Sequence, residues 1–300
     1  MKSVQILLST YNGERYLDEQ LQSLIGQVDV NVSILVRDDG SKDSTQLILE
    51  KWGKKGIIKW YKGENLKPAK SFWDLVKQSP KADYYAFCDQ DDIWEKNKLI
   101  VAINQIEKVQ NNEPTLYYSA LNPVDENLNA KNYQKNEKHV DSLGRAMLVS
   151  YAAGCTMVFN HKLMELAQKS NPQHLRMHDH WLYLICSSVN GKIIYDTNSY
   201  INYRQHSFNT VGISVSKSQQ FKRLIGSYNK GNQERWRQVK ELKVIYSEYI
   251  PEENLQLINS IVNYRNSLMN KFKVIFKPDL KTGFFTKDCL FYISIIMGKF

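Results

Sequence analysis

Phe87-Cys88-Asp89-Gln90-Asp91-Asp92-Ile93-Trp94 places three carboxylates within four residues. They follow a short apolar run, Tyr84 to Phe87, which predicts a buried strand that surfaces at the aspartates. Carboxylates this close repel one another, and hard oxygen ligands at a strand end suit Mg²⁺ or Mn²⁺, with a substrate phosphate as the usual co-ligand. A solvated acidic turn that caps the next helix explains the same residues. The stretch alone leaves both interpretations open.

Outward from this stretch, strands and helices alternate along the chain. Apolar runs predict strands at Val4–Ser9, Val32–Val36, Ile57–Tyr61 and Tyr84–Phe87. Helical spacing predicts helices over Glu14–Leu24, from Asp43 onward, over Pro68–Lys77 and over Asn97–Val109. Such alternation predicts an α/β fold whose mostly parallel sheet is flanked by helices. Functional residues then lie at the carboxyl ends of strands, and the polar clusters fall there: Thr10-Tyr11-Asn12, Asp38-Asp39-Gly40-Ser41 and Asp89 to Asp92.

Composition indicates an ordinary soluble protein of one large domain and an appendage. The 300 residues are 42% hydrophobic and 24% charged, within the range of globular chains. The four cysteines are scattered, without the paired spacing of a zinc or redox site, and suit a reducing compartment. We find neither a signal peptide nor an uncharged apolar run of membrane-spanning length, roughly 18–20 residues. The expected location is the cytoplasm.

The positive charge gathers near the C-terminus. Residues 217–300 hold 15 Lys and Arg against 7 Asp and Glu, and so carry nearly all of the chain's net charge of +9. The segment has no recognisable nucleic-acid motif, and its apolar residues cluster from Phe284 to Ile296. This pattern favours helices that lie on the inner face of the cell membrane. A helical hairpin that buries the same residues against the main domain is the alternative.

The residues after the first strand argue against two classes of nucleotide-binding enzyme. No glycine-rich phosphate loop follows the first strand, which argues against dehydrogenases and P-loop enzymes. The first cluster instead offers the Thr10 hydroxyl and the Tyr11 ring, on which a base can stack. Asp38 and Asp39 add carboxylates able to accept from a pyrimidine or a ribose. Nucleotidyltransferases share some of these features but usually have an N-terminal glycine-rich basic loop, which residues 10–15 lack.

The motifs Ile6 to Gly13, Val36 to Asp43 and Asp89 to Asp92 resemble, in this order, the inverting family-2 glycosyltransferases of GT-A fold. The resemblance covers roughly residues 3–212. It implies a nucleotide-sugar donor and a divalent metal, Mg²⁺ or Mn²⁺. The implied nucleotide-sugar contacts are Thr10, Tyr11, Asn12, Asp39 and Asp89, and the implied metal ligands are Asp91 and Asp92. Where many relatives have Asn-x-Gly, this chain has Asn65-Leu66-Lys67, so the resemblance carries no diphosphate contact to that segment.

The second half is expected to bind the acceptor and to supply the base. The resemblance implies that Asp179, just before a helix predicted over Trp181–Val189, is the general base. An aspartate at a helix start is otherwise often an N-cap. Arg204 is expected either to pair with the diphosphate or to form a structural salt bridge, and His206 to be a metal ligand or a core histidine. Gly154 to Met157 is predicted to form a strand beneath the acceptor. The predicted acceptor contacts are Gly154, Cys155, His178 and Trp181.

The pattern Asp89 to Trp94 and the stretch Tyr203 to Gly212 are similar to bacterial rhamnosyltransferases of surface-polysaccharide synthesis. The resemblance implies transfer of L-rhamnose from dTDP-β-L-rhamnose to a saccharide acceptor, in lipid-linked form. A UDP-hexose donor and a non-catalytic sugar-nucleotide-binding module are the alternatives. The predicted organisation is a GT-A domain over 1–216, with a donor half (1–112) and an acceptor half (113–216), and a basic helical region over 217–300. An oligomer is compatible with the sequence.

Overall fold

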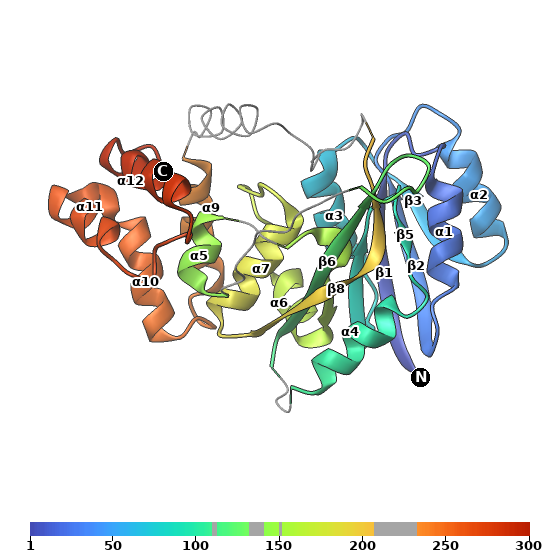
Figure 1. The fold of residues 1–300 in the computed structure, drawn as a ribbon, viewed down its shortest axis with the longest axis horizontal. Coiled ribbons are helices and arrows are strands. Elements are labelled where there is room, and N and C mark those ends of the chain that lie inside the picture. The colour runs from blue at the N-terminus through green and yellow to red at the C-terminus, as the bar shows by residue number, and fades with distance from the viewer. Residues whose placement is uncertain (110–112, 132–140, 150–151, 207–232) are drawn as a thin grey trace.

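The computed structural model describes residues 1–109, 113–131, 141–149, 152–206 and 233–300 (Figure 1). An eight-stranded sheet runs through it in the order β3-β2-β1-β4-β7-β6-β8-β5. The strands are β1 Lys2–Thr10, β2 Val30–Asp38, β3 Ile58–Lys62, β4 Tyr84–Cys88, β5 Ile93–Trp94, β6 Thr115–Val124, β7 Val158–Asn160 and β8 Lys192–Arg204. β3, β2, β1 and β4 run parallel, β7 is antiparallel to both of its neighbours, and β6 and β8 are again parallel. The predicted α/β architecture, with a mostly parallel sheet, is confirmed.

Helices cover both faces of this sheet. The described helices of the sheet region are α1 Leu17–Ile25, α2 Thr45–Lys54, α3 Lys67–Gln78, α4 Lys98–Glu107, α5 Leu143–Leu148, α6 His161–Lys169 and α7 His178–Ser188. Two hydrophobic cores result, because successive side chains of a strand point to opposite faces. In β4, Tyr85 and Phe87 enter the core formed with α3, α6 and α7. Ala86 and Cys88 enter the core formed with α1, α2 and α4.

The C-terminal region is helical, as predicted. It contains α9 Glu234–Tyr246, α10 Glu252–Val262, the short 3₁₀ helix η2 Tyr264–Asn266, α11 Leu268–Ile275 and α12 Phe285–Ile296. α9 packs on the sheet region: the Tyr246 hydroxyl donates to the Leu166 carbonyl at 3.0 Å, and its ring lies 6.3 Å from that of Trp181. α10 to α12 project away from β1 to β3 (Figure 1). The boundary predicted at 216/217 lies outside the described residues and stays a prediction.

One element differs from its prediction. Gly154 to Met157 is not a strand: Gly154–Thr156 forms a 3₁₀ turn, η1, and β7 begins only at Val158. The Met157 amide donates to the Gly154 carbonyl at 2.9 Å, which closes the turn. A side chain on Gly154 would put its Cβ 2.7 Å from Nε2 of His178, so the close approach of α7 requires glycine here. The glycine therefore serves packing between η1 and α7.

Candidate active site at the strand ends

The three polar clusters do converge at one edge of the sheet. Thr10 at the end of β1 pairs with Asp38 at the end of β2, and Leu8 of β1 pairs with Cys88, the last residue of β4. Asp89 to Asp92 therefore begin directly beside the end of β1. Parallel neighbours bring their carboxyl ends to the same edge. The strand pattern predicted this meeting correctly.

Gln90, to which the sequence assigned no role, links the first and third clusters. Its Oε1 accepts from the Thr10 hydroxyl at 2.6 Å and from the Tyr11 amide at 2.8 Å. Its Nε2 donates to the Tyr11 carbonyl at 3.2 Å. A Cβ on Gly13 would come within 2.6 Å of both Gln90 Oε1 and Thr10 Oγ1. The clamp fixes the backbone of Tyr11 while the Tyr11 side chain stays 43% exposed, available for stacking.

The second cluster is held by a buried arginine. Arg37 Nη1 forms an ion pair with Oδ1 of Asp39, and its Nε donates to Asp74 at 2.9 Å. Both Asp39 oxygens also accept backbone amides, from Leu66 at 2.8 Å and from Lys67 at 3.0 Å. Asp39, predicted to contact the nucleotide, thus anchors the segment that opens α3. Asn12 joins the same edge, because its amide donates to Ser41 Oγ at 2.9 Å.

The departure from Asn-x-Gly has a structural consequence at Lys67. Its φ is +68°, in the left-handed region that glycine adopts at little cost and other residues avoid. The backbone therefore keeps the conformation that a glycine would favour, although the residue is lysine. The bond from the Lys67 amide to Asp39 explains why this conformation is held.

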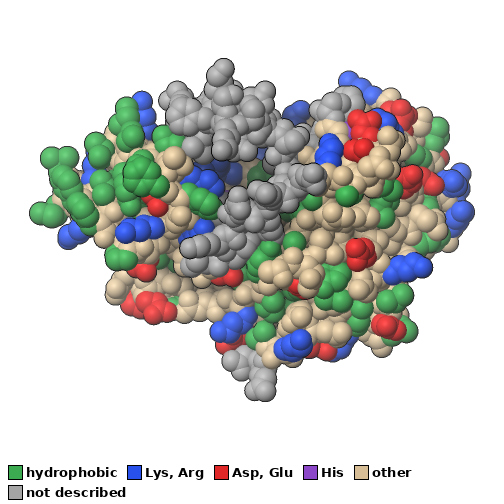
Figure 2. Space-filling model, in the orientation of Figure 1, with side chains coloured by type: hydrophobic (Ala, Val, Ile, Leu, Met, Phe, Trp, Pro, Cys, Tyr) green, Lys and Arg blue, Asp and Glu red, His purple; other side chains and the backbone are tan. Residues whose placement is uncertain are grey.

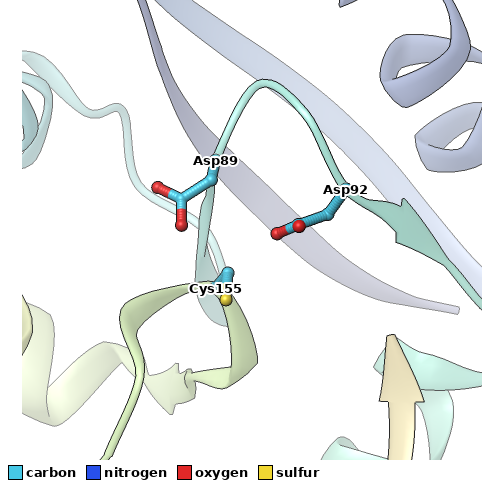
Figure 3. A group of neighbouring side chains, drawn as sticks. All are labelled: Asp89, Asp92 and Cys155. Atoms are coloured by element: carbon cyan, nitrogen blue, oxygen red, sulfur yellow. The ribbon is translucent and has the colours of Figure 1, made fainter. Parts of the chain in front are cut away.

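Asp89 and Asp92 approach the same point from the loop that follows β4, and Cys155 lies beside them on η1 (Figure 3). One ligand atom from each of the three lies within 4.8 Å of the others. Burial, with the carboxylates of Asp91 and Asp179 nearby, raises the pKa of Asp89 to about 7. Burial, with Asp91 and Asp89 nearby, also raises the pKa of Asp92. These shifts mark a concentration of negative charge that a cation would relieve.

The residues of this cluster differ as metal ligands. Asp92 Oδ2 is buried and has no hydrogen-bond partner among the described residues, so it has a free ligand position. Burial raises the pKa of Cys155 well above its ordinary value, which keeps the thiol neutral. A neutral sulfur is a poor ligand for Mg²⁺ or Mn²⁺, which prefer oxygen. The carboxylates therefore fit a hard divalent cation, and Cys155 fits a neighbour of the cation better than a ligand.

Asp91 and His206, both predicted metal ligands, also meet. His206 Nε2 lies 2.7 Å from Asp91 Oδ2, and the imidazole stacks on the Tyr16 ring with centroids 5.2 Å apart. Tyr16 comes from the turn before α1. The contact joins residues 115 positions apart and brings the end of β8 to the loop Asp89 to Asp92, which we call the acidic loop. The rest of the predicted motif, Ser207 to Gly212, lies outside the described residues.

Arg204 forms the structural salt bridge that the sequence offered as one of its two roles. Its Nη2 donates to Glu19 Oε2 at 2.7 Å, its Nε to the Asp91 carbonyl at 2.9 Å and its Nη1 to the Glu126 carbonyl at 2.6 Å. Its backbone amide donates to Asp92 Oδ1 at 3.1 Å. The side chain is 3% exposed. Arg204 therefore positions the acidic loop, Asp89 to Asp92, and its alternative role as a diphosphate contact stays a prediction.

Asp179 lies in the first turn of α7, which begins at His178, three residues earlier than predicted. The N-cap position is Met177, so Asp179 is not the plain N-cap of the alternative interpretation. Its Oδ2 accepts from the Gly154 amide at 3.1 Å and its Oδ1 from the His180 amide at 2.6 Å. Burial raises the pKa of Asp179 to about 6. The carboxylate is ionised at neutral pH and more basic than an ordinary aspartate.

The two remaining predicted acceptor contacts are buried. His178 stacks on Phe72 at 3.9 Å between centroids, and burial lowers its pKa to about 3, so the ring is neutral. Trp181 is fully buried, and its indole N–H donates to Ser170 at 3.3 Å. The structure makes Trp181 a core residue without any surface for an acceptor. The sequence signal was an aromatic near Asp179, which does not distinguish a core position from a surface one.

Comparison with known proteins agrees with this geometry. The model of the family "Glycosyl transferase family 2" matches residues 5–164. The dTDP-rhamnosyl transferase RfbG of Shigella flexneri is 32% identical over 238 residues, which are 72% of this chain and 78% of RfbG. The Escherichia coli UDP-Glc:alpha-D-GlcNAc-diphosphoundecaprenol beta-1,3-glucosyltransferase WfgD is 31% identical over 121 residues, 40% of this chain and 47% of WfgD. The crystal structure of Staphylococcus aureus TarS (residues 1–349) superposes with a TM-score of 0.58 at 18% identity, covering 93% of this chain and 76% of TarS.

Proposed function

This chain belongs to glycosyl transferase family 2, and from that premise we propose that it transfers L-rhamnose from dTDP-β-L-rhamnose to a saccharide acceptor with inversion at the anomeric carbon. The observation that carries the proposal is the position of Asp179, a basic carboxylate beside the acidic loop at the strand ends. The likeness to RfbG, which extends over most of both chains, supports the donor.

Asp179 is the proposed general base. It takes the proton from the acceptor hydroxyl as that oxygen attacks the anomeric carbon, and the bond from the sugar to the dTDP oxygen breaks in the same displacement. Its two backbone hydrogen bonds hold the carboxylate in place, and its raised pKa improves proton uptake. General-base assistance of this kind contributes about 10²–10⁴-fold to the rate.

The nucleotide is proposed to bind at the ends of β1 and β2. Tyr11, with its backbone clamped by Gln90 and its ring exposed, provides a stacking surface for thymine. Thr10 and Asn12 line the same edge, and Asp89 faces the ribose. Asp39 contributes by fixing segment 65–67 through its backbone bonds.

Mg²⁺ or Mn²⁺ is the proposed cofactor, with Asp91, Asp92 and His206 as ligands. Asp92 Oδ2 is buried and accepts no hydrogen bond within the part of the chain that the structure describes; this atom and the carboxylates crowded around it fit a hard divalent cation. When bound, the ion stabilises the charge on the departing diphosphate as a Lewis acid. Arg204 holds both Asp91 and Asp92 from behind, so the ligands are positioned before any ion arrives.

The proposed acceptor is a saccharide on a polyprenyl diphosphate. WfgD, by its name, acts on such a lipid-linked sugar. The turn η1, with Gly154 and Cys155, is proposed to form the acceptor side of the site, and the buried His178 of α7 is proposed to support this turn from behind. An acceptor of this kind implies work at the cytoplasmic face of the inner membrane, in the synthesis of cell-surface polysaccharide.

A donor panel tests the proposal. Purified protein is assayed with dTDP-rhamnose, UDP-glucose, UDP-galactose and UDP-N-acetylhexosamines, with Mg²⁺, Mn²⁺ or excess chelator. We expect turnover of dTDP-rhamnose and loss of turnover in chelator and in Asp91→Ala. Turnover of UDP-glucose alone would establish the second candidate, which the likeness to WfgD favours. Full activity in excess chelator would show that transfer does not need a metal. Nucleotide binding without turnover of any donor would indicate a non-catalytic binding module.

A further inference from the structure

The two last helices present apolar side chains to solvent. On α11 and just beyond it, four such side chains are 55–75% exposed: Leu268, Met269, Phe272 and Phe276. On α12 and just beyond it, four are 52–84% exposed: Phe285, Ile293, Ile296 and Met297. The spacings of three, four and eight residues place each set on one side of its helix. We call these eight residues together the C-terminal apolar face.

This face is separate from the one that holds the helices in the fold. Val274 of α11 and Phe291 and Ile295 of α12 are buried, and the Phe291 ring packs on Phe300 at 5.1 Å. Of the apolar residues that the sequence offered for burial in a hairpin, Phe291 and Ile295 are buried, whereas Phe285, Ile293 and Ile296 are exposed. Each helix has one apolar side that anchors it and a second that the fold does not use.

The two exposed stripes lie side by side. The Lys271 ammonium of α11 donates a hydrogen bond to the carbonyl of Ile296 of α12 at 2.7 Å. Within the α11 stripe, the rings of Phe272 and Phe276 stack at 6.4 Å. In the space-filling view, hydrophobic side chains gather over α11 and α12 with lysines among them (Figure 2). Monomeric soluble proteins rarely expose a contiguous apolar patch of this kind unless it is a binding surface for a protein, a ligand or a membrane.

The surrounding charge identifies the partner. Residues 263–300 hold seven Lys and Arg and only two Asp. One of the two, Asp288, accepts from the amide and hydroxyl of Thr282 at 2.6 and 2.7 Å, so it is engaged within the fold. A second copy of the chain would bring two such basic regions together at a cost. An anionic lipid surface offers both complementary attractions, acyl chains for the apolar groups and phosphates for the lysines.

We propose that the C-terminal apolar face docks on an anionic lipid bilayer, with α11 and α12 in the interface and Lys273, Lys281 and Lys299 at the headgroups. This inference rests on the proposed function for the membrane location, and names the surface that binds the membrane from its exposed apolar and basic side chains. No helix of the described residues is long and apolar enough to cross a membrane. Docking at this face would hold the site near a lipid-linked acceptor.

Vesicle co-sedimentation of the full chain tests this docking. We expect binding to phosphatidylcholine vesicles that contain phosphatidylglycerol, weak binding to phosphatidylcholine alone, and release as salt rises. Phe272→Glu/Phe276→Glu is expected to weaken the partition about tenfold or more, because it places charge where acyl chains would be. The control is Leu47→Glu/Val244→Glu, two residues that are 67% and 71% exposed elsewhere; it should bind as the wild type does.

Three results would overturn the proposal: no pelleting at low salt, equal losses in the test and control variants, or a wild-type dimer in sedimentation velocity that the test variant dissociates. The last would assign the face to self-association. Thermal melts of all variants check the fold. The vesicles contain neither donor nor polyprenyl acceptor, so a failure of rhamnosyl transfer leaves this result unaffected, and a failure to dock leaves the chemistry at Asp179 unaffected.

Discussion

The strand-end site and the C-terminal apolar face depart from ordinary packing in opposite directions. At the site, carboxylates are drawn inside: Asp92 is fully buried, and Asp89 and Asp92 both have raised pKa values. At the C-terminal face, Phe276 and Phe285 stay outside at 75% and 84% exposure. Neither arrangement maximises the stability of the isolated chain. Such local violations are expected where a binding partner supplies what is missing; the partners that we propose are a cation and a donor in one region and a lipid surface in the other.

Substitution of the proposed base gives the largest expected effect. Asp179→Asn keeps the size of the side chain but cannot accept a proton, so kcat should fall about 10²–10⁴-fold. Binding of dTDP, measured by calorimetry, should stay near the wild-type value, because Asp179 is proposed to act on the acceptor and not on the nucleotide. A variant that transfers at the normal rate would show that this buried carboxylate is structural, and the contrast between the two regions would then lose its functional basis.

Neighbouring isoleucines of α12 sharpen the comparison. Ile295 is fully buried and Ile296 is 59% exposed. Ile295→Ala should lower the free energy of unfolding by about 2–5 kcal/mol, whereas Ile296→Ala should change it by less than about 0.5 kcal/mol. Denaturant melts measure both. The exposed position should instead lower vesicle binding, so equal losses of stability would mean that α12 packs differently and that the apolar face is not a separate surface.

The pH dependence of transfer is expected to follow Asp179. Its pKa is about 6, and the base works only when deprotonated, so kcat should rise with pH and level off above about 7. Below pH 6, protonation should cost about tenfold per pH unit. His178, with its pKa lowered to about 3, does not titrate in this window, whereas Asp89, with its pKa raised to about 7, does. The control is the residual rate of Asp179→Asn, which should lose the limb near pH 6 and keep only the dependence on Asp89.

The sequence predicted the backbone framework better than the side-chain partners. Local patterns place Thr10, Asp38 and Asp89 at strand ends, and parallel pairing then brings them together. The role of Arg204 could not be decided from the chain, because its partner Glu19 lies 185 residues away and no local signal connects them. Gln90 was missed for the same reason: a glutamine between aspartates has no helical or strand preference that points to Tyr11.

The two acceptor-side misjudgements have a different cause. Gly154 to Met157 has the composition of a buried strand, but it forms a 3₁₀ turn closed by the bond from the Met157 amide to the Gly154 carbonyl, and it packs where only glycine fits beside His178. Trp181 lies only two residues after Asp179, yet the rotation of the helix over those two residues, about half a turn, carries it into the core. In both cases tertiary packing overrides a local preference. The C-terminal helices show the converse, since exposure of Ile296 beside buried Ile295 depends on which side of α12 meets the rest of the fold.

The smallest expected effect concerns Lys67 and asks whether the site carries backbone strain as well as buried charge. Lysine at a φ of +68° costs about 1–2 kcal/mol relative to its preferred conformation, and glycine avoids this cost while gaining entropy in the unfolded chain. We therefore expect Lys67→Gly to raise the free energy of unfolding by about 0.5–1 kcal/mol. The matched control is Lys70→Gly, which removes the same charge from an exposed position inside α3 and should lower that energy by about 1 kcal/mol. Chemical denaturation at one ionic strength compares the two variants. A loss of stability in both would mean that Lys67 does not hold the left-handed conformation in solution, and that Asp39 anchors a different backbone from the one described.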